Sequence, residues 1–215
     1  KATAAIEEGI GQRICILSNE EEAHLGYLGA KLDQDLEEGT MVDIGGGSTE
    51  LTSIKGGFDL AKTSIPQGSL SSFANYVAGL MPTQKEVNAI AQAFRELAKK
   101  EETDVYHCTQ LYGIGGSIRS AAKLYGDLCN NGNRFNYLLP EHIDAILNRY
   151  AEGTNAFAHE ALRTLPDRIH TLIPGCVIIR EAFKLCDGER LDICKYGVRE
   201  GYLAERVLVK PVSFA

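Results

Sequence analysis

Three consecutive glycines at positions 45–47 separate two short apolar runs, and they constrain the fold more than any other feature. The run over 41–44 is typical of a buried strand, and the run over 50–54 is typical of a second one. A glycine pair at 56–57 predicts a tight turn that leads into a third strand over 58–65. Because such short connections join antiparallel neighbours, we predict an antiparallel meander.

Two capping boxes predict helices on either side of this meander. Ser18 is followed three residues later by Glu21, and Thr83 is followed by Glu86 at the same spacing. At this spacing each side chain can accept a hydrogen bond from the other residue's backbone N–H at a helix start. We therefore expect one helix after Ser18 and another from Thr83 through Lys100.

The rest of the chain alternates between strands and helices. The predicted strands cover 13–17, 110–114 and 191–196, and the predicted helices cover 1–11, 117 to about 125, 140–150, 155–164, 175–186 and the residues from about 199. Antiparallel strands followed by alternating helices and strands are the order of a ribonuclease-H-like (actin-like ATPase) α/β domain. We predict a mixed sheet that contains the meander and is flanked by helices.

Length and charge limit the classes of partner. The 215 residues, 44% of them hydrophobic, can form one large domain or one and a half around a buried core. With a net charge of −7 the chain is a poor non-specific binder of nucleic acid, so we expect no nucleic-acid partner. It has no apolar run close to the twenty residues of a membrane span, so we expect no membrane partner.

The six cysteines are scattered, and none forms a C-x-x-C pair. In a chain of this size that pattern indicates reduced thiols in a cytoplasmic protein, and it argues against a disulfide framework or a zinc site. The five histidines show no metal-ligand spacing either.

The segment over 43–50, with the sequence DIGGGSTE, carries the strongest chemical signal. Glycines at the end of a strand let the backbone turn sharply and present several N–H groups to one anion. Ser48 and Thr49 add hydroxyl donors, and Asp43 and Glu50 are placed to hold a metal ion or an ordered water. The alternative is a glycine-rich hairpin without a ligand, but the flanking acids and hydroxyls favour an anion site.

A second junction of this kind occurs at Gly115, Gly116 and Ser117, between a predicted strand and a predicted helix. Free N–H groups at a helix N-terminus attract phosphate. Alone the junction is a weak signal, since any tight turn can use glycines, but two junctions could hold consecutive phosphates. Neither matches a Walker loop or the dinucleotide-binding fingerprint.

Other charged residues are uninformative by themselves. Acids at positions 20–22 are favoured by the helix dipole at a helix start, with or without a function. Arg168, which precedes a Pro-Gly pair at 174–175, has the character of a surface arginine.

Taken together, these motifs resemble the exopolyphosphatase/guanosine pentaphosphate phosphatase (Ppx/GppA) family of the actin–Hsp70–sugar kinase superfamily. The resemblance covers nearly the whole chain, and DIGGGSTE is its most specific part. The other segments that resemble family motifs are SNEEEA over 18–23, IPQG over 65–68, GGS over 115–117, Arg168 through the Pro-Gly pair at 174–175, and GVREG over 197–201.

The resemblance implies a role for each matching residue. Glu22 would be the catalytic base for the attacking water, and Glu50 a second catalytic acid. Asp43 and Glu50 would be residues of an Mg²⁺ site, Mg²⁺ being the expected cofactor. The phosphate-binding residues would be Gly45, Gly46, Gly47, Ser48, Gly115, Gly116, Ser117 and Arg168.

The family pattern also implies two lobes with the active site in the cleft between them. Residues 1–17 would be a remnant of the N-terminal lobe, and residues 18–215 would be the second ribonuclease-H-like lobe with its C-terminal helices. The opening motif of the first lobe has no counterpart before Asp43, so we expect a fragment that carries one wall of the site, with the missing N-terminal lobe as a partner. We do not expect this chain alone to be a complete catalyst.

Three functions remain open. The favoured one is a hydrolase of phosphoanhydride bonds that releases terminal orthophosphate from inorganic polyphosphate or guanosine pentaphosphate. The alternatives are a non-catalytic phosphate- or polyphosphate-binding module and a nucleotide-dependent kinase of the same superfamily. A homodimer is possible by analogy with family members, although the residues carry no interface signal.

Overall fold

One mixed sheet, with the strand order β3-β2-β1-β4-β6-β5, runs through a computed structural model that describes residues 2–129 and 132–208. The strands are β1 (Glu38–Ile44), β2 (Thr49–Lys55), β3 (Phe58–Ile65), β4 (Gln110–Ile114), β5 (Tyr137–Leu138) and β6 (Arg190–Ile193).

The helices are α1 (Ala2–Ile10), α2 (Asn19–Ala30), α3 (Ser69–Tyr76), α4 (Gln84–Ala98), α5 (Gly116–Cys129), α6 (Pro140–Glu152), α7 (Thr154–Thr164), α8 (Ile169–Cys186) and α9 (Val198–Tyr202). Short 3-10 turns cover Asp104–Tyr106 and Pro166–Arg168, and a π-helical turn, Leu203–Val207, continues α9. No helix in the described part of the chain combines the length and the apolar character needed to cross a membrane.

The predicted meander is confirmed. β1 pairs antiparallel with β2, and β2 pairs antiparallel with β3. The turn between β2 and β3 consists of Gly56 and Gly57, whose φ angles are 58° and 74°. A two-residue hairpin of this twist needs positive φ at both positions, which is why two glycines occupy it.

The remaining strands bring both glycine junctions to one edge of the sheet. β4 pairs in parallel with β1 on one side and with β6 on the other. β1 ends at Ile44, directly before the triple glycine, and β4 ends at Ile114, directly before Gly115. Because parallel strands end at the same edge, the two junctions become neighbours, and this edge is where α/β sheets bind ligands.

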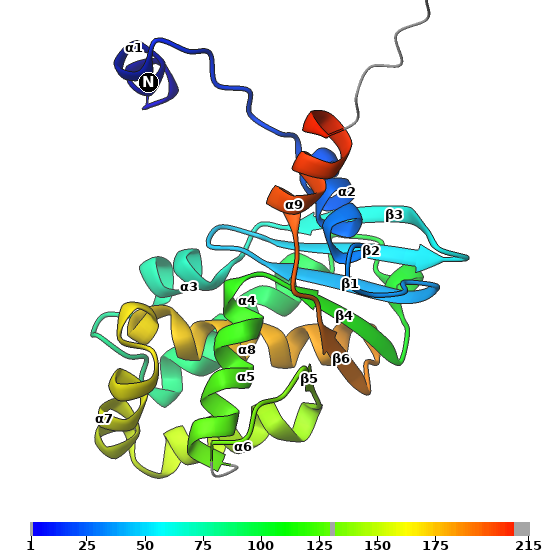
Figure 1. Ribbon diagram of the computed structural model, residues 1–215. Helices are drawn as coiled ribbons and strands as arrows, with labels where there is room; N and C mark the ends of the chain where they lie inside the picture. Colours follow the sequence, from blue (N-terminus) through cyan, green and yellow to red (C-terminus); the bar gives the residue numbers. More distant parts are fainter. Residues whose placement is uncertain (1, 130–131, 209–215) are drawn as a thin grey trace, which may run out of the picture.

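Each face of the sheet has its own core, and successive residues of β1 alternate between them. Met41 packs with Tyr27 of α2 in the smaller core, and Val42 packs in the larger core, which also contains Ile178 of α8. Figure 1 shows α2 and α9 on one side of the sheet, with α4, α5, α6 and α8 on the other. This layered mixed α/β architecture confirms the predicted fold class.

The predicted buried strand over 13–17 is wrong. This segment has no regular secondary structure, and Ile16 is 73% exposed. Figure 1 shows it as an extended connection between α1 and α2, with α1 lying away from the sheet. An apolar run forms a strand only where a neighbouring strand takes up its backbone hydrogen bonds, and the sheet offers this segment no neighbour.

Three further elements differ from the prediction. Helix α3 and the short strand β5 were not expected, and α8 begins at Ile169 instead of 175, with Pro174 inside it. The serine-rich sequence of α3 has no strong apolar period, so this helix depends on tertiary contacts at its first turn. The division into residues 1–17 and 18–215 stays a prediction, and its last residues, 209–215, lie outside the described ranges.

Candidate active site

The triple-glycine turn is held against the first turn of α3. The Gly45 N–H donates to the Ser48 carbonyl at 3.0 Å and closes the turn. The carbonyl oxygen of Gly45 accepts from the Ser69 N–H at 3.0 Å, and that of Gly46 accepts from Leu70 at 2.9 Å. A side chain at Gly68 would bring its Cβ within 2.6 Å of the Gly45 oxygen, so this approach requires glycine there.

This anchoring leaves the donors of the turn available. The carbonyls of Gly45 and Gly46 face α3, while the N–H groups of Gly46 and Gly47 donate to no acceptor within the described residues. Both glycines are exposed. Consecutive N–H groups without internal partners form a concave anion site, which is the geometry expected of a phosphate-holding turn.

The second glycine junction lies beside the first. Gly115 has a φ of 96°, which favours glycine, and α5 begins at the next residue. Ser117 in the first turn of α5 donates from its Oγ to the Oγ of Ser69 at 3.2 Å. A Cβ at Gly175 of α8 would stand 3.3 Å from the Ser117 Cβ, so the Pro-Gly pair of α8 lets α8 pack closely behind this contact.

Arg168 completes this wall of the site. It ends the 3-10 turn before α8, is exposed, and has no carboxylate partner among the described residues. A pocket of about 530 Å³ lies between its guanidinium and the two glycine junctions. Of the predicted phosphate-binding residues, Gly45, Gly46, Gly116, Ser117 and Arg168 line it.

The other predicted residues lie just outside this pocket. Gly47 and Ser48 belong to the same turn but do not line it, and Gly115 lines a neighbouring pocket together with Asp43. Glu22 and Glu50 line neither pocket.

Two carboxylates face each other across the β1–β2 pair. Asp43 is directly opposite Glu50 in the antiparallel register, so both side chains project from the same face of the sheet. Burial, followed by the charges of Glu50 and Glu22, raises the pKa of Asp43 to about 7, while the charge of Arg119 acts in the opposite direction. Such perturbed carboxyl groups cluster at functional sites.

Glu50 is buried, with 3% of its surface exposed. Burial raises its pKa, while the hydroxyls of Ser48 and Ser64 act in the opposite direction. The Ser64 Oγ donates to the Glu50 carboxylate at 2.9 Å. The carboxyl group is thus held by hydroxyl donors and by no cation within the described residues.

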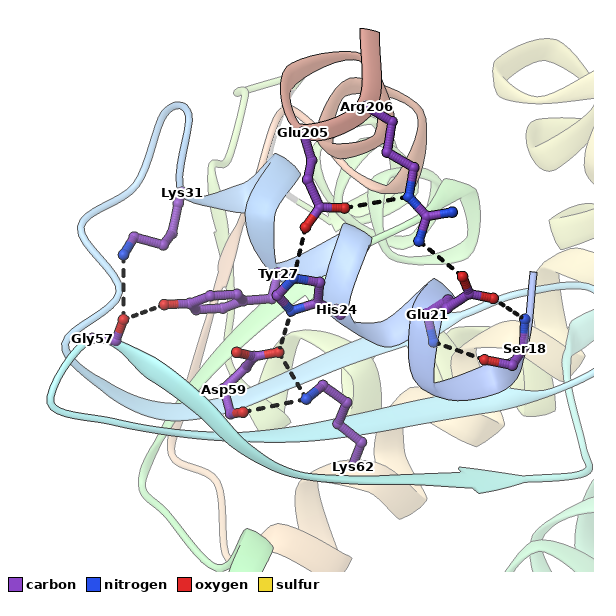
Figure 2. Close-up of polar contacts among 10 residues, drawn as sticks. All are labelled: Ser18, Glu21, His24, Tyr27, Lys31, Gly57, Asp59, Lys62, Glu205 and Arg206. Atoms are coloured by element: carbon purple, nitrogen blue, oxygen red, sulfur yellow. Dashed lines mark hydrogen bonds and ion pairs between the residues drawn. The ribbon is translucent and has the colours of Figure 1, made fainter. Parts of the chain in front are cut away.

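Helix α2 presents Glu22 towards these two carboxylates. The neighbouring Glu21 is engaged elsewhere, since it accepts the Ser18 N–H in the predicted capping box and forms an ion pair with Arg206 at 2.8 Å. One turn on, His24 contacts Asp59 of β3 at 2.7 Å. Figure 2 shows both anchors on α2.

Glu22 itself is exposed, and its side chain has no hydrogen-bond or ion-pair partner within the described residues. Its charge nevertheless raises the pKa of both Asp43 and Glu50, which requires its carboxylate to lie near theirs. Three acids predicted from separate segments therefore share one region of the site.

The carboxylate oxygens of Asp43 and Glu50 are ligands of the kind that Mg²⁺ prefers. No group of three or more His, Cys, Asp or Glu side chains within residues 2–129 and 132–208 is arranged to hold a metal ion. Mg²⁺ commonly uses one or two carboxylates together with water and substrate phosphates, and Asp43 with Glu50 provides such a pair. A cation there would also relieve the repulsion that raises the pKa of Asp43.

Several lining residues were not predicted. Ser69, Leu70, His170 and Thr171 line the main pocket, and Arg119 lies near Asp43 in the first turn of α5. The position of Arg119 in the first turn of a helix could have identified it. A cation there interacts unfavourably with the helix dipole, so its presence suggests a function.

Comparison with known proteins agrees with this geometry. Residues 3–210 match the model of the Ppx/GppA phosphatase family. The chain is similar to the solved structure of an Aquifex aeolicus Ppx/GppA family member, with 23% identity and a TM-score of 0.76 over 96% of this chain and 68% of that one. It is also similar to an exopolyphosphatase from Cytophaga hutchinsonii, with 17% identity and a TM-score of 0.78 over 94% and 68% of the two chains.

At these identities the structural neighbours show a shared fold, whereas the family match extends over nearly the whole sequence. The pocket formed by two glycine junctions and an arginine, beside a group of carboxylates, is chemically suited to binding phosphate groups. The chain therefore belongs to the Ppx/GppA phosphatase family of phosphohydrolases.

Proposed function

We propose that this chain, completed by the N-terminal lobe that the family pattern implies, removes the terminal orthophosphate from inorganic polyphosphate or guanosine pentaphosphate. The main support is the single pocket that Gly46, Gly116 and Arg168 line together, next to the Glu22, Asp43 and Glu50 carboxylates. Backbone N–H groups and a guanidinium on one side can hold phosphate oxygens. Carboxylates on the other side can activate water, and phosphoryl transfer requires this division of roles.

Glu22 is the proposed base. The attacking water gives a proton to its carboxylate while the water oxygen bonds to the terminal phosphorus. The bond between that phosphorus and the bridging oxygen breaks, and the shortened chain leaves with the bonding electron pair. Arg168 and the glycine N–H groups stabilise the negative charge that builds on the phosphate oxygens.

Asp43 and Glu50 are the proposed Mg²⁺ residues. When bound, Mg²⁺ would neutralise charge on the phosphate oxygens. The two carboxylates also orient solvent around the phosphate, since Glu50 is fixed by Ser64 and lies opposite Asp43.

A pair of variants tests the role of Glu22. In the complete two-lobed protein, Glu22→Gln should reduce orthophosphate release from polyphosphate with Mg²⁺ by at least about a hundredfold, the usual contribution of a general base. Its affinity for polyphosphate should change little. Glu20→Gln is the matched control, because Glu20 is exposed in the same helical turn. Release by Glu22→Gln within tenfold of the unchanged two-lobed protein would show that Glu22 is not the base.

The same assay separates the proposed function from the alternative of a binding module. Orthophosphate release that requires Glu22 supports the phosphohydrolase. Parallel measurements with polyphosphate and with guanosine pentaphosphate identify the preferred substrate. If this chain and the same chain extended by its N-terminal lobe both bind polyphosphate but release no orthophosphate from either compound, the binding module is favoured. Release by the extended form alone supports a two-lobed phosphohydrolase.

A further inference from the structure

A second pocket, of about 280 Å³, lies alongside α5 and is strongly cationic. Its charged lining residues are Arg119, Lys123, Arg134 and Lys195, and no carboxylate of the described residues lines it. We call it the outer pocket. In a chain with a net charge of −7, four cations gathered around one small cavity stand out from the general surface.

Nearby acids compensate the charge of these cations only in part: Asp43 and Glu200 interact electrostatically with Arg119, and Asp33 interacts with Lys195. Arg119, Arg134 and Lys195 are exposed, and none of them forms an ion pair with another described residue. Lys123 donates from its Nζ to the Thr164 carbonyl at 2.7 Å, a neutral partner that leaves its charge uncompensated. Like charges held close together repel, so this arrangement favours a bound anion.

The outer pocket continues into the candidate active site. Arg119 and Lys195 also line the pocket of about 180 Å³ that contains Asp43 and Gly115. Arg199 adds a further cation to that inner pocket. The acid beside it, Glu200, already accepts the Gly197 N–H at 3.0 Å.

The two pockets share Arg119 and Lys195, so they adjoin along the first half of α5, and we call the pair the groove. It begins at the edge where β1 and β4 end, and it leads towards Arg134 in the segment before β5.

We propose that the outer pocket binds phosphate groups of a phosphate chain whose terminal phosphate lies at the glycine junctions. This inference rests on the proposed function for the identity of the chain. A linear polyanion that leaves the active site along the groove meets Arg119 and Lys195 first and then Lys123 and Arg134. The arginines can each bind phosphate oxygens through two N–H groups, and the lysines add point charges.

Variants of Lys123 and Arg134 test this proposal, because these two residues line the outer pocket only. Arg134→Gln and the double variant Lys123→Gln/Arg134→Gln are compared with the unchanged chain by titration calorimetry. The ligands are tripolyphosphate and long-chain polyphosphate. Arg134→Gln is included because Lys123 also contacts Thr164, and its loss could disturb the fold.

A control variant matches the charge change. Lys55→Gln/Lys85→Gln removes two exposed cations that belong to neither pocket. We expect the outer-pocket double variant to bind long-chain polyphosphate about tenfold more weakly, with a smaller dependence on salt, while tripolyphosphate affinity is unchanged. The control should bind both ligands as the unchanged chain does.

Two results would overturn the proposal. One is unchanged affinity for the long chain in both outer-pocket variants. The other is an equal loss for both ligands that the Lys55/Lys85 control reproduces, which would mean that the cations act only through net charge.

The binding stoichiometry identifies the source of the phosphates. If the unchanged chain binds two tripolyphosphate molecules and the double variant binds one, the outer pocket is a phosphate site that a separate molecule can occupy. If both proteins bind one tripolyphosphate molecule and the double variant binds long-chain polyphosphate more weakly, the outer pocket binds the far part of a single polyphosphate molecule. The absence of orthophosphate release even from the chain completed by its N-terminal lobe would contradict the proposed function, whereas the binding result would remain.

Discussion

The guanidinium of Arg168 lies directly against the backbone of Gly116: a Cβ at Gly116 would stand 2.5 Å from Nη2 and 2.7 Å from Nη1. The two residues come from different parts of the chain, the start of α5 and the turn before α8. Besides the proposed approach of phosphate, glycine is needed at position 116 because a larger residue would displace the Arg168 guanidinium from the pocket wall.

Adding one methyl group at this position should displace the arginine. We predict that Gly116→Ala weakens binding of tripolyphosphate by about tenfold, because the guanidinium must leave its place beside the two glycine junctions. Titration calorimetry measures this change. Gly79→Ala is the control, since its Cβ would come no closer than 3.7 Å to a neighbouring atom. Full affinity in Gly116→Ala would contradict the assignment of Arg168 to the phosphate pocket.

The raised pKa of Asp43 predicts a pH-dependent cost to stability. Its pKa is about 7 in the folded chain and near 3.8 when unfolded, so between these values the folded state binds more protons. Stability contributed by this group is therefore lost as the pH rises from about 4 to 7. Asp43→Asn should raise the free energy of unfolding, and the gain should be larger at pH 8 than at pH 5, by roughly 2 kcal/mol.

Urea denaturation at the two pH values, without divalent metal, measures this effect. The exposed acid Asp144 offers a comparison, because Asp144→Asn should show no such growth with pH. A gain from Asp43→Asn that is equal at pH 5 and pH 8 would mean that Asp43 titrates normally.

Mg²⁺ should stabilise the chain through the same carboxylates. We predict that millimolar Mg²⁺ raises the melting temperature at pH 8, because the cation offsets the repulsion between Asp43 and Glu50. The rise should be absent in Asp43→Asn and present in Asp144→Asn. Thermal unfolding with and without Mg²⁺ gives the answer, and an equal rise in all three proteins would place the metal elsewhere.

The cysteines should divide by burial in their reactivity. Burial raises the pKa of Cys176, Cys186 and Cys194 to about 12, while Cys15 is exposed. Since the thiolate is the reactive form, we predict rapid labelling of Cys15 by a thiol reagent at pH 8. The three buried thiols should react only after unfolding in denaturant. Fast labelling of Cys194 in the folded chain would show that the core around α2 opens readily.

Several elements of the fold could be predicted from the sequence alone. The meander and the capping box at Ser18 depend on residues close together in the chain, and the structure confirms both. Both glycine junctions could be located in the sequence, whereas their meeting at one edge of the sheet depends on the parallel pairing of β1 with β4. Local steric preferences and hydrogen-bond spacing are written directly in neighbouring residues, so such features need no knowledge of the packing.

Only the tertiary structure decided how distant segments complete the site. Arg168 has the sequence character of a surface arginine, and its place beside Gly116 depends on how α8 packs against α5. The first turn of α3 is held by carbonyls of a turn some twenty residues earlier, and Arg119 joins two pockets whose walls come from several elements. The apolar run over 13–17 fails as a strand for the same physical reason. A contact between distant segments forms only where packing brings a partner, and one segment of sequence does not contain its partner.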